Sequence, residues 1–74
     1  MTYNELKQAV QWGEEFNFYL KNEEFWISQN NEGYYLTQTD GGYQKFKTSE
    51  ELFEKGKING KTILELWDEI KDYF

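Results

Sequence analysis

Carboxylates are the main side chains in this chain that could take part in chemistry. Fourteen Asp and Glu residues stand beside eight Lys among the 74 residues, while Arg, His and Cys are absent. General acid–base catalysis by a carboxyl group requires a pocket that raises its pKa. Three adjacent pairs instead fall near expected turns, strand ends or helix starts: Glu14-Glu15, Glu23-Glu24 and Glu50-Glu51. Because water or a helix end engages carboxylates in such places, the spacing argues against paired-carboxylate catalysis.

Nucleophilic and metal-dependent chemistry also lack their usual residues. Ser28 and Ser49 have no His to activate them, so a Ser–Lys arrangement is the one nucleophilic alternative. Without Cys and His there is no thiolate or imidazole ligand for zinc. Residues 30–33 and 40–42 lack the alternating carboxylates of a calcium loop and are typical of turns. We therefore expect a protein that is not an enzyme and holds no metal or cofactor.

Three repeated helix-start signals outline the elements that position these side chains. In a capping box, a Thr hydroxyl accepts a hydrogen bond from the N–H three residues later, and a Glu there accepts one from the Thr N–H. Gly13 and Gly56 are expected to end the first two helices, Gly56 in a left-handed conformation. The third helix is expected to carry the widest apolar stripe, with Ile63, Trp67 and Ile70. The three boxes are Thr2–Glu5, Thr48–Glu51 and Thr62–Glu65.

Between the first and second helices the apolar period changes from 3.6 to 2, which predicts strands. Turn-forming residues separate the strands, and links this short force antiparallel neighbours. We expect loops at residues 22–23, 31–32 and 40–42, the last with a Gly in the left-handed region. These loops place the apolar residues on one face of the sheet. The expected pairs are Leu20 with Phe25, Phe18 with Ile27, Ile27 with Leu36, and Leu36 with Phe46.

The order of elements predicts an α+β fold. It has an N-terminal helix, an antiparallel meander of three to four strands, and two C-terminal helices packed on one sheet face. Residues 1–74 form a single small domain, which buries only about 60% of its unfolded surface. Large rings are expected to fill this thin core: Phe16, Phe18, Phe25, Phe46, Phe53 and Trp67. No basic-then-apolar leader or ~20-residue apolar run is present, so we expect a cytoplasmic protein.

From about residue 15 to residue 74, the sequence resembles short proteins of unknown function from Gram-positive bacteria and their phages. The resemblance implies no activity and no functional residue. It is carried by four stretches: residues 16–19 (Phe-Asn-Phe-Tyr), 33–36 (Gly-Tyr-Tyr-Leu), 46–52 (Phe-Lys-Thr-Ser-Glu-Glu-Leu) and 58–67 (Ile-Asn-Gly-Lys-Thr-Ile-Leu-Glu-Leu-Trp).

The strand alternation sends a second set of rings away from the main core. These are Tyr19, Trp26, Tyr35 and Tyr43, alongside Ser28, Thr37 and Lys45. Tyr and Trp concentrate at protein interfaces because they offer stiff, amphipathic contact area. The alternative is that the N-terminal helix or Trp12 covers this face, since Tyr3, Leu6 and Val10 must also be buried. The sequence leaves both arrangements open.

We therefore hypothesise a small acidic protein-binding module that serves as an accessory of a phage or mobile element. It would bind a protein partner or a second copy of itself through the four rings. Proteins that stack nucleic-acid bases on aromatic sheet residues surround those rings with Lys and Arg. The net charge here is −6, so we expect no direct nucleic-acid binding and no membrane binding. The alternative is an inhibitor of a DNA-handling enzyme that mimics nucleic acid through Glu65, Asp68, Glu69 and Asp72.

Overall fold

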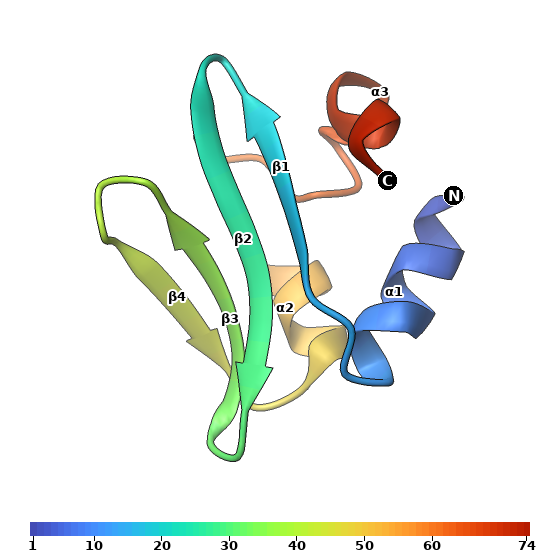
Figure 1. Ribbon diagram of the computed structural model, residues 1–74, viewed down its shortest axis with the longest axis vertical. Coiled ribbons are helices and arrows are strands. Elements are labelled where there is room, and N and C mark those ends of the chain that lie inside the picture. The colour runs from blue at the N-terminus through green and yellow to red at the C-terminus, as the bar shows by residue number, and fades with distance from the viewer.

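A four-stranded antiparallel sheet and a set of helices form the two layers of the molecule (Figure 1). The computed structural model describes residues 1–74 and confirms the α+β fold predicted from the sequence. No helix has the length and apolar character needed to cross a membrane. The elements are α1 (Tyr3–Gln11), β1 (Phe16–Leu20), β2 (Glu23–Asn30), β3 (Gly33–Gln38), β4 (Tyr43–Phe46), α2 (Ser49–Lys55), α3 (Trp67–Ile70) and the 3₁₀ helix η1 (Lys71–Tyr73).

The helices bury their apolar side chains against one face of the sheet. Leu6 and Val10 of α1 and Leu52 of α2 have no exposed surface, and they join the inward residues of β1, β2 and β3. In Figure 1 the strands pass in front of α2, so the opposite face of the sheet points toward the viewer. The single core consists of Leu6, Val10, Phe18, Leu20, Phe25, Ile27, Leu36, Leu52, Phe53, Ile58, Ile63, Leu66 and Ile70.

Aromatic rings fill much of this thin layer. Phe18 stacks on Phe25 at a centroid separation of 5.5 Å and lies equally close to Phe74. Of the six rings predicted to be inside, three are buried and the other three pack against the core while partly exposed. The buried rings are Phe18, Phe25 and Phe53, and the partly buried ones are Phe16, Phe46 and Trp67.

The three predicted Thr and Glu pairs form two complete capping boxes and one that is half formed. Thr2 and Glu5 form both bonds of the box, because the Thr2 N–H donates to the Glu5 carboxylate (2.7 Å) and the Glu5 N–H donates to the Thr2 hydroxyl (3.1 Å). The second box is only half formed. The Glu51 N–H donates to Thr48, but the Glu51 carboxylate accepts from the Lys47 N–H instead of the Thr48 N–H.

The last segment is not the continuous helix that its apolar stripe predicted. The Thr62–Glu65 capping bonds form, but only Trp67–Ile70 is α-helical, and η1 follows. Tight i→i−3 bonds precede and overlap α3, such as the Trp67 N–H to the Leu64 carbonyl (3.2 Å). Residues three apart lie on one side of such a tight turn. Ile63 and Leu66 are both buried as a result.

The first hairpin turns one residue earlier than predicted. Its loop is Lys21 and Asn22, whose φ angles of 50° and 68° are both left-handed. A two-residue loop of this kind matches the twist of the strands. Phe18, and not Leu20, therefore pairs with Phe25. The register moves by two residues, so each side chain keeps its predicted face.

The second hairpin has the predicted register, with Ile27 opposite Leu36. The third has the predicted three-residue form, but its loop spans residues 39–41 and not 40–42. Gly41 supplies the left-handed residue, with φ at +94°. The Asp40 carboxylate accepts a hydrogen bond from the following Gly42 N–H (2.8 Å), which fixes the turn at this position. Leu36 consequently pairs with Gln44 and not with Phe46, again without a change of face.

Gly56 ends α2, but not in the predicted left-handed conformation. Its φ is −66°, in the extended region. Glycine is required here by close contact, since a Cβ atom at this position would lie 2.5 Å from the Leu52 carbonyl oxygen and 3.4 Å from Leu36 Cδ2. The last turn of α2 itself therefore requires a glycine at this position.

We predict that Gly56→Ala lowers the free energy of unfolding by about 1–3 kcal/mol, because the added methyl group would clash with the Leu52 carbonyl and crowd Leu36. The control is Gly42→Ala, whose Cβ meets no backbone atom and only the end of the Asp40 side chain at 3.1 Å, so we expect a smaller loss of less than about 1 kcal/mol. Urea unfolding measures both. Equal effects of the two substitutions would contradict the close-contact explanation.

Acid should weaken the fold through the two complete capping boxes. Hydrogen bonds from the Thr2 backbone and side chain lower the pKa of Glu5 below 4.5, and those from Thr62 lower the pKa of Glu65 in the same way. A lowered folded-state pKa means that the stabilisation is complete above about pH 4.5 and is lost as the pH falls through the folded value. In urea titrations between about pH 6 and pH 3, the Glu5→Gln, Glu65→Gln double variant should show a shallower loss of stability than the wild type. An unchanged slope would contradict this, and Glu69→Gln is the control.

Candidate functional site

The helices leave the opposite surface of the sheet uncovered (Figure 1). We call it the outer face. Cross-strand pairing sets its side chains in rows, with Tyr19 beside Glu24, and Trp26 between Asn17 and Thr37. The outer face consists of Glu15, Asn17, Tyr19, Glu24, Trp26, Ser28, Tyr35, Thr37, Tyr43 and Lys45.

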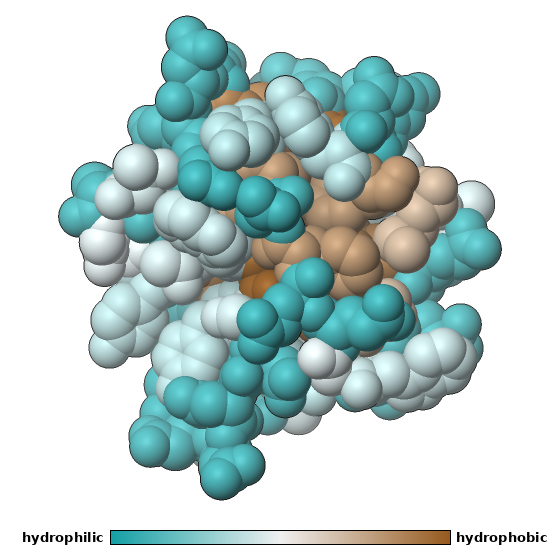
Figure 2. Space-filling model, viewed as in Figure 1, coloured by the Kyte–Doolittle hydropathy of each residue, from teal (hydrophilic) through white to brown (hydrophobic).

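The structure places all four rings predicted for binding on the outer face. Tyr43 is 65% exposed, Tyr19 45% and Trp26 36%, while Tyr35 is half-buried among its neighbours. Figure 2 shows side chains of intermediate hydropathy over β3 and β4, whereas the most hydrophobic ones reach the surface beside β1. The face is therefore amphipathic and not simply apolar.

Neither α1 nor Trp12 covers these rings. Leu6 and Val10 bury α1 on the inner side of the sheet, and Trp12 at the end of α1 is 72% exposed. Hydrogen bonds from the Gln29 amide and the Tyr34 hydroxyl tie the end of α1 to the β2–β3 end of the sheet. Of the two arrangements that the sequence left open, the structure has the uncovered one.

Two aromatic pairs flank Trp26. Tyr35 and Tyr43 have ring centroids 5.8 Å apart, and Tyr19 lies 5.7 Å from Tyr73 of η1. Tyr73 is half exposed and extends the aromatic surface past the β1 edge. Sequence reasoning missed Tyr73, because its position depends on the break between α3 and η1.

A shallow hollow of about 250 Å³ lies next to Trp26. Glu15, Asn17 and Ser28 border it on the outer face, and Phe16 and Ile27 complete the lining. A larger hollow of about 570 Å³ lies between α1 and α2, but Phe53 is its only hydrophobic residue. Ligand sites are mostly apolar with a few polar groups, so the smaller hollow is the better candidate for a contact.

Only some charged side chains of the outer face have a partner of opposite charge. Lys45 is the only lysine in the four strands, and its Nζ lies 3.3 Å from the Glu32 carboxylate. Glu24 has no lysine partner, but its Oε2 accepts a hydrogen bond from Asn17 Nδ2 at 2.7 Å. The negative charge of Glu24, followed by desolvation, raises the pKa of the Tyr19 phenol. The Tyr19–Glu24 corner is thus a region of negative potential.

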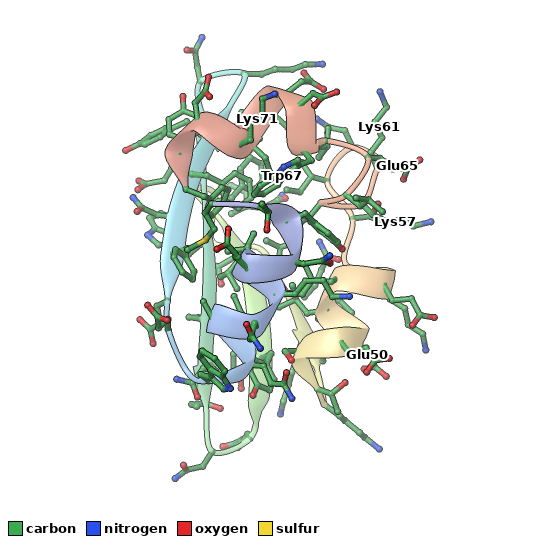
Figure 3. The ribbon with its side chains drawn as sticks, turned by 90° about the vertical axis from the view of Figure 1, so that its right-hand side faces the viewer. Glu50, Lys57, Lys61, Glu65, Trp67 and Lys71 are labelled. Carbon is green, nitrogen blue, oxygen red and sulfur yellow. The ribbon has the colours of Figure 1, made fainter.

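The four acidic residues of the alternative hypothesis are all exposed, but they do not lie along one regular helix. Glu65 precedes α3 and its carboxylate caps Thr62. Asp68 lies 3.7 Å from the Lys71 ammonium. Figure 3 shows Lys57 and Lys61 at the same end of the molecule as Glu65, and both lysines lower the Glu65 pKa. Lysines therefore interrupt this acidic surface.

No known protein family, curated protein or solved structure matches the chain. No group of three or more carboxylates converges in a way that could hold a metal ion. Function must be inferred from the geometry of the outer face.

We predict that Glu24→Gln returns the pKa of Tyr19 toward its ordinary value of 10.0, because the substitution removes the charge that raises it most. An NMR titration of the tyrosine rings between about pH 9 and pH 12 measures this shift. Glu69→Gln removes the same charge from α3 and should leave Tyr19 unchanged. A Tyr19 pKa that does not respond to Glu24→Gln would show that the two side chains are not close in solution.

Proposed function

We propose that the chain is a small, non-enzymatic protein-binding module that docks through its outer face, with Trp26, Tyr35 and Tyr19 as anchors. The observation that carries the proposal is the one-sided fold. All helices bury the inner side of the sheet, while the large amphipathic rings stay on the uncovered side. Tyr and Trp dominate the energetics of protein interfaces because they combine contact area with a polar atom.

The size of the face suits a protein partner. A standard interface occupies about 800 Å² on each protein, and the accessible surface of this chain is 4919 Å². One broad side of a two-layer domain this small offers an area of that order. The polar side chains among the rings, such as Asn17, Ser28 and Thr37, supply hydrogen-bonding groups for a rim.

A protein partner fits the charges better than nucleic acid does. Phosphate neutralisation by Lys and Arg dominates nucleic-acid affinity, and the one strand lysine, Lys45, is already paired with Glu32. The nucleic-acid mimic gains no support from the last segment, whose acidic side chains are divided among a turn, α3 and η1. A phage or mobile-element role belongs to the same proposal and rests on the sequence resemblance, and we propose a cytoplasmic location alongside it.

We expect Trp26→Ala to reduce capture of a cellular partner at least about tenfold, because interface tryptophans are frequent hot spots. Quantitative pull-downs compare it with wild type and with Trp12→Ala, which removes an exposed Trp away from the outer face. Sedimentation of the wild type identifies the case in which the partner is a second copy.

Stability measurements keep this test interpretable. Trp26→Ala should cost about 1 kcal/mol or less, whereas Phe18→Ala, in the core, should cost about 3–5 kcal/mol. A Trp26→Ala variant as unstable as Phe18→Ala would mean that the ring belongs to the core. Equal loss of capture by Trp26→Ala and Trp12→Ala would place the binding surface elsewhere.

A further inference from the structure

Glu24 is a carboxylate set among aromatic rings without a cation of its own. Its side chain is half-buried on the outer face, and the Asn17 amide holds it at 2.7 Å. The backbone beneath it is also fixed, because the Glu24 N–H and carbonyl both bond to the Thr39 hydroxyl at 2.9 Å. Hydrogen bonds to both its side chain and its backbone therefore hold the Glu24 carboxylate in one position.

Two rings border this carboxylate. Tyr19 lies directly opposite Glu24 across the β1–β2 pair, where facing Cβ atoms are about 5 Å apart. Trp26 lies two residues further along β2 on the same face, about 7 Å away. Tyr73 packs against Tyr19 and extends the aromatic surface beside it. A cationic group that binds here could therefore pair with the carboxylate and pack on one or two rings at the same time.

The chain cannot fill this site itself. It contains no arginine, and Lys45, which lies on β4 at the opposite edge of the outer face, is engaged by Glu32. Glu15, which borders the hollow on the other side of Trp26, has no lysine partner either. A second copy would bring the same unpaired carboxylates and a net charge of −6, so the two chains would repel.

We propose that the outer face binds a basic segment of a protein partner, with an arginine side chain seated against Trp26 and Tyr19 and paired with Glu24. This inference rests on the proposed protein-binding function and specifies the chemistry of the partner. Arginine fits better than lysine because its planar guanidinium stacks on aromatic rings while donating to a carboxylate. The Glu15 carboxylate beside the hollow can receive a second basic residue of the same segment.

The experiment is an NMR titration of the whole chain with two peptides of equal charge, acetyl-hexaarginine amide and acetyl-hexalysine amide, at low salt. We expect hexaarginine to shift the Trp26 indole and the amides around Tyr19 and Glu24 first. It should also bind more tightly than hexalysine. Glu24→Gln keeps the oxygen that accepts from Asn17 but removes the charge, and it should weaken hexaarginine binding about three- to fivefold. Glu69→Gln, an equal loss of charge on α3, should change binding less than about twofold.

Three results would overturn the proposal: shifts spread over all acidic surfaces, equal affinity for the two peptides, or equal effects of Glu24→Gln and Glu69→Gln. If one of these occurs while Trp26→Ala still abolishes partner capture, the arginine site fails and the protein-binding function stands. If Trp26→Ala leaves capture unchanged while hexaarginine still binds at Glu24, the cation site is real but is not the partner's docking point.

Discussion

Helices and sheet in a two-layer domain can bury apolar surface only against each other, and here every helix uses the same side of the sheet. The strands alternate, so Phe18, Ile27 and Leu36 fill that layer while Tyr19 and Trp26 point the other way. Because a chain this small has no further helix, the second side of the sheet stays uncovered. The capping boxes, the close approach at Gly56 and the tight turns before α3 all serve to keep the inner layer filled.

Strand alternation is also the reason why the sheet could be predicted from sequence. Two of the three hairpins turn one residue away from the predicted place, yet the pairing slips by two residues and each side chain keeps its face. The sorting of Phe to the core and of Tyr19, Trp26, Tyr35 and Tyr43 to the outer face therefore survived errors in register. A slip of one residue would have reversed it.

Other features depend on contacts that no local pattern encodes. Gly56 looked like a left-handed helix end, but the Leu52 carbonyl, not the turn, requires the glycine. The last segment keeps its apolar spacing and its capping box, yet tertiary packing tightens it into short turns. Tyr73 reaches Tyr19, and Glu24 meets Asn17, only after that packing and the β1–β2 register are in place.

The three tryptophans occupy three distinct environments, which gives the protein built-in optical reporters. Trp12 stands in solvent at 72% exposure, Trp26 lies on the outer face, and Trp67 stacks on Phe74 at 5.4 Å between α1 and the C-terminal segment. Collisional quenching of fluorescence depends on such differences in access to solvent. Single-tryptophan versions of the chain can thus separate emission that follows global unfolding from emission that follows events at the sheet surface, without any attached dye.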